Sequence, residues 1–337
     1  MNTDVPQPQV TRKSQIGRRT LQELGDWWIL GILLILVIFF STFAPGFFTV
    51  DNFVSTTEDA STTLILAVAE TFVIITGGID LSVGAMLGLS GMVSGWFMEQ
   101  MLPHGTLVSL VVGVIGGIVA GGVLGLLNGL IITRLEVTPF ISTLGMLGMA
   151  TGFTFLISNG SDIVNVPQQV GNIGNTVWFQ FLSVPFVISL VIVVIAQYFL
   201  RRTRFGRYTY ALGSNREGAR RAGINVKAHL LKIYTMAGLL SAIAGILILT
   251  RLISASPLEG QNDELNAIAA VVIGGASLFG GRGNIIASAI GALIISTLVN
   301  GLVILGVQPY WQEVSLGIII IVAVYVDQSR YRNRVLR

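Results

Sequence analysis

Long segments with almost no charged residue restrict this fold more than any other feature of the sequence. Ten such segments are strongly apolar, and they cover roughly residues 27–44, 61–79, 83–102, 107–132, 138–157, 182–200, 229–250, 265–279, 284–305 and 310–327. A helix needs about 20 apolar residues to cross the hydrocarbon core of a bilayer. Only 11% of the chain is charged, against about 25% of an average soluble domain. The segments therefore predict a membrane protein and exclude a soluble enzyme, a disordered chain and a nucleic-acid-binding module.

The apolar segments are expected to be helices rather than strands. Transmembrane strands alternate polar and apolar residues over about ten positions, and these segments show no such alternation. We therefore predict an all-α integral membrane protein with about ten transmembrane helices. Segments 61–79 and 265–279 run into Gly-Gly pairs. Each is either a full span or a broken, re-entrant helix, which a membrane tolerates only where protein covers the backbone.

The positions of the basic residues predict the orientation in the membrane. With ten spans and both termini in the cytoplasm, every Lys and Arg except Arg251 falls on the cytoplasmic side, as the positive-inside rule requires. We expect a cytoplasmic tail over 1–26, a single transmembrane domain over 27–327 with a cytoplasmic loop over 201–228, and a second cytoplasmic tail over 328–337.

The loop contains the signature of a short capped helix from Asn215 to Ala222. Ser214 and Glu217 have the spacing of a capping box, Glu217 and Arg221 form an i,i+4 pair, and Gly223 is placed to end the helix. The residues assigned to this helix and its caps are Ser214, Asn215, Arg216, Glu217, Ala219, Arg220, Ala222 and Gly223. Because two turns are marginal alone, the helix is expected to pack against a partner. The alternative is a solvated basic loop that only fixes the topology.

The turn GGIDLSVG at 77–84 is the second candidate site, with Gly77, Gly78, Asp80 and Ser82 as its key residues. One interpretation is structural, because Asp80 or Ser82 can accept hydrogen bonds from the first turn of the following helix. The other is that Asp80 contacts a partner or gates the inner mouth.

Polar residues within apolar segments are candidates for a substrate pathway. Glu70 lies in the middle of a span, where an ionisable group must face protein or water. The full candidate set is Glu70, Asn128, Ser142, Thr143, Ser296 and Asn300. Each of these residues has hydrogen bonding between helices as its alternative role.

Five glycines spaced four residues apart, namely Gly113, Gly117, Gly121, Gly125 and Gly129, form a stripe on one segment. At 1.5 Å per residue the stripe is about 24 Å long. Small residues allow close approach of membrane helices. The stripe therefore predicts a packing face, either within the chain or between two copies.

Four blocks in order resemble the membrane subunits of monosaccharide ABC importers of the ribose/xylose/arabinose group: GGIDLSVG (77–84), NGLIITRLEVTPFISTLGM (128–146), GSNREGARRAGI (213–224) and IAAVVIGGASLFGGRGN (268–284). The resemblance implies a BtuC-like type II ABC importer architecture in the bacterial inner (cytoplasmic) membrane. It also implies partners: a second permease copy or paralogue, cytoplasmic ATPase subunits that carry ATP and Mg, and a sugar-binding protein outside. In such permeases the short cytoplasmic helix sits in a groove of the ATPase.

The chain itself is expected to bind no cofactor and to catalyse no reaction. It has no Cys and no G-x-x-x-x-G-K-[ST] motif, so ATP is hydrolysed by another subunit. The alternatives are a branched-chain amino-acid or nucleoside permease of the same superfamily, an ion-coupled transporter that uses Glu70 and Asp80, and an intramembrane enzyme, for which no paired catalytic residues are found.

Arg251 is the basic residue that this topology places outside. By the same resemblance it is expected to dock acidic residues of the binding protein, because a guanidinium can grip a carboxylate with two hydrogen bonds. The alternative is an internal ion pair with Glu259, Asp263 or Glu264.

Overall fold

The computed structural model describes the backbone of residues 12–335 and the side chains of residues 28–325 and 327–329. Within them the predicted helical fold is confirmed. The main helices are α1 (Arg12–Phe43), α2 (Val50–Ile75), α3 (Val83–Met101), α4 (Thr106–Arg134), α5 (Pro139–Ser158), α7 (Val184–Arg202), α8 (Arg204–Ser214), α9 (Arg216–Arg221), α10 (Val226–Leu252), α11 (Asp263–Ile273), α12 (Ile285–Ile304) and α13 (Pro309–Val335).

The remaining elements are small. They are the 3-10 turns η1 (Leu102–His104) and η2 (Gln168–Val170), the single turn α6 (Gly171–Gly174), and the antiparallel pair β1 (Val177–Trp178) and β2 (Leu182–Ser183). In that pair Val177 lies opposite Ser183 and Trp178 opposite Leu182. The segment before α6 is fastened to the segment after α10 by an antiparallel bridge between Ile163 and Ala255.

Six described helices are long and apolar enough to cross a membrane, and they are α4, α5, α7, α10, α12 and α13. In each case the predicted segment differs from the helix by a few residues at the ends, apart from the basic C-terminal extension of α13. These helices make the chain a multi-pass membrane protein. The count of about ten spans stays a prediction.

Segment 265–279 is not one continuous helix, because α11 has only 11 residues and ends at Ile273. At 1.5 Å per residue it is about 16 Å long, roughly half the thickness of a bilayer core. The rest of the predicted segment belongs to a glycine-rich turn that leads into α12. Of the two interpretations left open for 265–279, the structure favours the broken helix. Segment 61–79, in contrast, lies in the continuous helix α2 up to Ile75.

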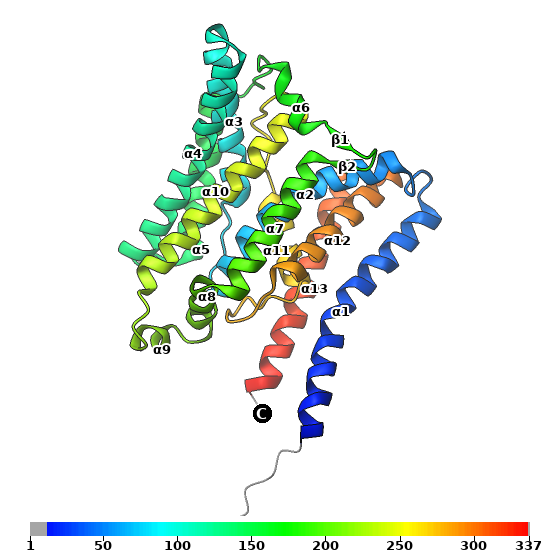
Figure 1. Cartoon of the computed structure of the whole chain (residues 1–337), viewed down its shortest axis with the longest axis vertical. Coiled ribbons are helices and arrows are strands. Elements are labelled where there is room, and N and C mark those ends of the chain that lie inside the picture. Colours follow the sequence, from blue (N-terminus) through cyan, green and yellow to red (C-terminus); the bar gives the residue numbers. More distant parts are fainter. Residues whose placement is uncertain (1–11, 336–337) are drawn as a thin grey trace, which may run out of the picture.

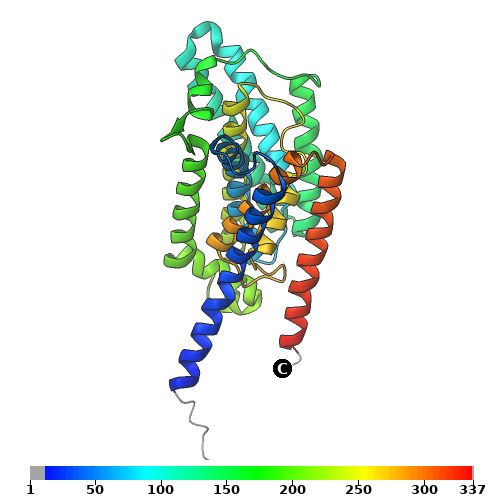
Figure 2. The ribbon, with the colours of Figure 1, turned by 90° about the vertical axis from the view of Figure 1, so that its right-hand side faces the viewer.

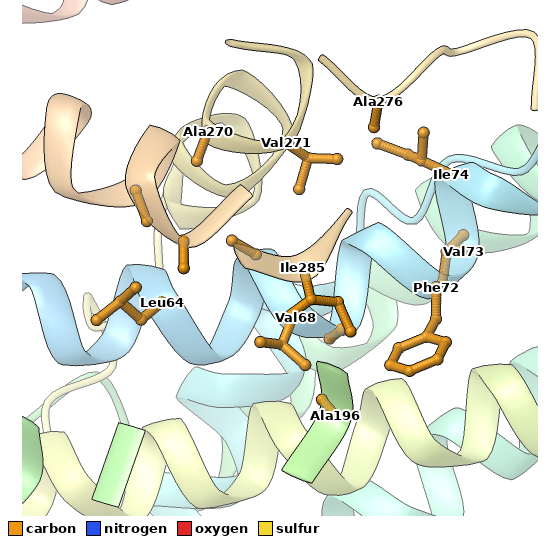
Figure 3. Close-up of a cluster of buried hydrophobic side chains, with 14 of the residues drawn as sticks. Leu64, Val68, Phe72, Val73, Ile74, Ala196, Ala270, Val271, Ala276 and Ile285 are labelled. Atoms are coloured by element: carbon orange, nitrogen blue, oxygen red, sulfur yellow. The ribbon is translucent and has the colours of Figure 1, made fainter. Parts of the chain in front are cut away.

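The core is built around α2, which is buried on all sides over its second half. A helix that is apolar all round is expected in such a position. Figure 3 shows Leu64, Val68 and Phe72 of α2 among side chains from α7, α11 and α12. Helix α2 thus supplies several bulky side chains to this cluster, and its neighbours supply small ones such as Ala196 and Ala270 beside larger ones such as Ile285.

The two ends of the helical bundle differ in what they hold. The start of α1, the helices α8 and α9, and the end of α13 lie at one end, which we call the α9 end, and α6 and η1 lie at the opposite, α6 end (Figures 1 and 2). Helix α1 already begins at Arg12, within the predicted tail 1–26, and α13 continues through most of the tail 328–337. Residues 1–11 and 336–337 of these tails lie outside the described residues.

Candidate functional site

The short helix predicted in the basic loop is α9, and its N-cap differs from the prediction. Ser214 is the last residue of α8, and Asn215 is the N-cap. The Asn215 side-chain oxygen accepts a hydrogen bond from the Gly218 amide at 2.7 Å. Ser214 cannot cap α9 because its own backbone is helical, whereas Asn215 has the extended backbone that an N-cap needs (φ −159°, ψ 100°). The prediction of a capping box formed by Ser214 and Glu217 is therefore wrong.

The other end of α9 agrees with the prediction. Gly223 has a φ of +83°, and the amide of Ile224 donates to the carbonyl of Ala219 at 3.1 Å, which is the bond pattern of a helix ended by glycine at C′. Glu217 and Arg221 form the predicted ion pair at 3.2 Å. Both side chains are mostly exposed, so this pair adds only about 0.3–0.5 kcal/mol.

The predicted small-residue face of α9 is divided between the inside and the outside of the chain. Ala219 is buried against Leu212, Val226 and Leu230 of the neighbouring helices, whereas Ala222 is exposed. Ala219 therefore packs α9 against its own subunit. The groups that α9 offers to a partner are the charged ones, including Arg216 and Arg220, which are exposed.

A cleft of about 680 Å³ lies between α9 and the turn that joins α4 to α5. Its charged lining includes Arg216, Arg220, Glu136 and Lys227. Lys227 donates to Glu136 at 2.8 Å, and this hydrogen bond lowers the pKa of the Glu136 carboxyl. The cleft thus joins the exposed side of α9 to a second exposed turn at the α9 end.

Helix α8 connects α9 to two glycine-rich turns, 76–82 and 274–284. A Cβ atom on Gly213 would clash with the carbonyl of Ile75 and the amide of Gly281, so only glycine fits at this position of α8. The amide of Gly281 in turn donates to the Ile75 carbonyl at 2.8 Å. The two turns, whose sequences resemble each other, therefore touch each other and the end of α8.

Four of the polar residues predicted to face the interior join the 76–82 turn in one buried hydrogen-bond network. The Asp80 amide donates to Glu70 at 3.1 Å, and Asp80 accepts from both the amide and the hydroxyl of Ser82, at 2.9 and 2.5 Å. Asn128 donates to the Ser82 hydroxyl at 2.8 Å and accepts from Ser142 at 3.2 Å. The network thus links α2, the turn, α4 and α5.

The network supports a structural role for Asp80 rather than contact with a partner. Asp80 has no exposed surface, so it cannot contact a partner subunit in this conformation. It also binds the N-cap residue Ser82 rather than the first-turn amides of α3. Thr143 adds a further bond, because its hydroxyl donates to the carbonyl of Ile79 at 3.2 Å. Gly78 is needed beside these bonds, since a Cβ there would lie 2.6 Å from the Tyr234 hydroxyl.

The glycine stripe of α4 lies inside the subunit, where all five glycines are buried. Gly117 faces the carbonyl of Ser90 in α3, and Gly121 faces the carbonyl of Gly238 in α10. Cβ atoms at these positions would lie 2.8 and 2.5 Å from the two oxygens. Of the two packing faces that the spacing left open, the structure places the stripe between α4, α3 and α10.

A family described as the permease component of branched-chain amino acid transport systems matches residues 52–324 of this chain. The match runs from the first turn of α2 into α13, and it includes α9, both glycine-rich turns and the buried network. The chain belongs to this permease family. No solved structure matches it.

Several curated relatives of the permease are named as sugar import permeases. The ribose import permease of Escherichia coli K12 is 39% identical over 95% of this chain and 100% of its own length. That of Bacillus subtilis is 42% identical over 92% of this chain and 94% of its own. The fructose import permease of Rhizobium meliloti is 37% identical over 88% and 83%. The predicted resemblance to monosaccharide importer permeases is therefore confirmed.

Arg251 forms ion pairs within its own chain, with partners that sequence spacing did not indicate. It lies in the last turn of α10 and forms ion pairs with Glu58, at 3.5 Å, and with Asp59, both from the first half of α2. Within the described residues no ion pair joins it to Glu259, Asp263 or Glu264. The contacts support an internal role, with residues about 190 positions away as partners.

Ser296 and Asn300 lie apart from the buried network. Both are on α12, where Ser296 is buried, and Asn300 donates to Asn52 at the start of α2 at 3.0 Å. The predicted pathway set therefore divides into the network around the 76–82 turn and a separate contact between α12 and α2. Sequence reasoning did not place the polar residues of segment 257–264 in the pathway set, although Pro257 and Gly260 signal a break there.

Proposed function

We propose that this permease is the membrane subunit of an ATP-binding cassette importer that moves a monosaccharide into the cytoplasm. The observation that carries the proposal is its similarity to permeases named for ribose, allose and fructose, at 37–42% identity over 88–95% of this chain. The permease is the non-catalytic part of the assembly. It binds no cofactor itself, and ATP with Mg²⁺ is bound by a partner ATPase.

The α9 end of the bundle faces the cytoplasm in this proposal. The basic residues of α8, α9 and the start of α10 lie there, as the positive-inside rule requires. Both termini then lie in the cytoplasm, with about ten spans between them in a single permease domain over 27–327. The α6 end faces outward, toward a sugar-binding protein.

Coupling to the ATPase is assigned to α9. Its N-cap and its C′ glycine fix the ends of a very short helix, and Ala219 fastens it to α8 and α10. The exposed Arg216 and Arg220 are then free to contact an acidic groove. Because α8 seats against both glycine-rich turns without space for a methyl group, a movement of α9 is passed on to the turns that precede α3 and α12.

A second copy of the permease is expected to pack near α5. Gly145, Gly148 and Gly152 lie on one side of this helix, and a Cβ on any of them would meet no atom within 4 Å. In a membrane, such small-residue faces are contact sites for other helices. The homodimer is proposed from this uncovered face and from the family resemblance.

The proposal is tested by transport in proteoliposomes. The permease is purified and reconstituted with a candidate ATPase and binding protein from the same organism, and uptake of labelled ribose, allose and fructose is compared with that of leucine and valine. ATP-dependent uptake of a sugar, but not of the amino acids, is expected. Uptake of leucine or valine alone would instead support the branched-chain amino-acid function that gives the family its description.

A further inference from the structure

The chain between α10 and α11 runs without regular structure into the depth of the bundle. Ala255 lies beside Gly95 of α3, while Gly260 and Glu264 lie beside Gly84, near the other end of the same helix. Eleven residues of helix separate these two glycines, which corresponds to a descent of about 16 Å. Figure 1 shows α11 accordingly at mid-height of the bundle, although α10 extends up to α6.

Irregular backbone at membrane depth occurs only where protein covers it or where it lines a polar cavity. One side of this segment is covered by α3. Cβ atoms on Gly84 and Gly88 would clash with the carbonyls of Gly260 and Glu259, so the two glycines allow the irregular backbone to lie directly on the helix. Its other side is free to line a cavity.

A cavity of about 230 Å³ lies on that free side, between α3, α5 and residues 257–264. Its polar lining consists of Thr151, Thr154, Glu259, Gln261, Asn262 and Glu264. Thr154 and Glu264 are buried, with 2% and 8% of their surface exposed. Asn262 is held in place by its left-handed backbone, with a φ of +66°, and by a hydrogen bond to Glu313 of α13 at 3.2 Å.

The polar groups of this lining match a neutral polyhydroxyl molecule. Carboxylates accept hydrogen bonds from hydroxyl groups, amide side chains both donate and accept, and sugar hydroxyls can do either. Among the described residues none in the lining is basic. The carboxylate of an amino acid would therefore lack a cationic partner here and would meet Glu259 and Glu264. A sugar carries no charge that would lose its hydration on entry, and its hydroxyl groups could exchange hydrogen bonds with the polar side chains of the lining.

We propose that this cavity is the sugar contact of the transport pathway, formed by α5 and the broken segment before α11. The inference rests on the proposed sugar import. It assigns the contact to residues other than Asn128 and Ser142, whose side chains are taken up in the buried network. Broken helices at the middle of the membrane form the substrate sites of many transporters, and this segment has the same physical character.

The test uses the absence of cysteine from the natural sequence. Thr151→Cys and Gln261→Cys are made singly in the reconstituted importer, and each is treated from outside with a charged methanethiosulfonate reagent. Sugar uptake and ATP hydrolysis are measured for each variant before and after treatment, so that every variant is its own folding control. Ser161→Cys is the matched control, because Ser161 is exposed in the loop before α6.

Modification of the Thr151→Cys and Gln261→Cys variants should lower their uptake by at least about tenfold, which corresponds to about 1.4 kcal/mol, and added sugar should slow the modification. The modified Ser161→Cys variant should retain its uptake. Full modification at both pathway positions with unchanged uptake would overturn the inference, and so would failure of both to react during turnover. Failure of the proposed function is distinguishable, because the unmodified natural protein would then take up no sugar.

Discussion

Replacement of Gly121 by alanine is the sharpest test of how α4 packs. The added Cβ would lie 2.5 Å from the carbonyl oxygen of Gly238, 2.7 Å from the Cβ of Ala242 and 2.8 Å from the hydroxyl of Ser90. Two of these atoms belong to α10 and one to α3. A shift of α4 away from one of these helices would therefore bring the added methyl group closer to the other. Overpacking of this kind costs about 1–3 kcal/mol.

A second glycine-to-alanine change separates this clash from the general effect of alanine on a helix. Alanine is about 1 kcal/mol better than glycine within a helix, which would offset part of the clash at position 121. Gly31 of α1 is also within a helix but has no atom within 4 Å of its Cβ position. Gly31→Ala therefore supplies the same gain in propensity without the clash.

The assay measures the melting temperature of the purified permease in detergent. Melting is monitored as the loss of the monodisperse peak in size-exclusion chromatography. Gly121→Ala should melt below Gly31→Ala by several degrees, since 1 kcal/mol corresponds to roughly 2–4 °C in domains of 150–250 residues. Gly121→Leu should fail to give a stable protein. If Gly121→Ala melted at or above the temperature of Gly31→Ala, the close contact of α4 with α10 would be refuted.

Three further predictions concern α9, α5 and the buried network. Changing Arg216 and Arg220 together to Glu should lower sugar-stimulated ATP hydrolysis by roughly tenfold or more, because like charges facing each other at an interface cost several kcal/mol; a variant with full stimulation and a normal melting temperature would remove α9 from the coupling role. Gly148→Cys should be joined to a second copy by a short bifunctional thiol reagent in membranes, and recovery of monomer alone would contradict a dimer contact at α5. Asn128→Leu should destabilise the permease by about 1–3 kcal/mol, because Ser142 loses its hydrogen-bond acceptor and Ser82 keeps only its bond to Asp80; an unchanged melting temperature would show that the network adds no stability.

The short helix shows how far local sequence signals reach. The ion pair, the C′ glycine and the position of the helix were all predicted within about a residue. The N-cap was wrong because Ser214 and Asn215 are both good cap residues, and the local sequence does not choose between them. The choice depends on how far α8 continues, and α8 extends to Ser214 because Gly213 fits against Ile75 and Gly281. That contact joins residues far apart in the sequence.

Segment 265–279 shows the limit of hydropathy as a signal for spans. Its apolar residues are buried, but against α2 and α12 rather than against lipid. Hydropathy measures only how readily a side chain leaves water. It does not distinguish a side chain that enters a protein core from one that enters the hydrocarbon of a bilayer. The short length of α11 and the polar segment before it are what distinguish a half-helix inside the protein from a full span.

The polar residues within apolar segments were found from the sequence, but their partners were not. Asn128 and Ser82 are 46 residues apart, and Asn300 and Asn52 are 248 apart. An unpaired polar group in hydrocarbon is costly, so pairing of some kind could be expected. Which residues pair depends on the order of the helices in space, which single-sequence periodicity does not contain.

The glycines of this permease distinguish helix faces that are covered within one chain from faces that are not. Each glycine within a helix costs about 1 kcal/mol relative to alanine, so a set of them requires a compensating contact. The stripe from Gly113 to Gly129 has that contact inside the subunit, against the backbone of α3 and α10. Gly145, Gly148 and Gly152 of α5 meet no atom of their own chain. A contact for them would lie outside the chain, on the same helix that supplies Thr151 and Thr154 to the proposed sugar cavity, so a second copy at α5 would also enclose the pathway.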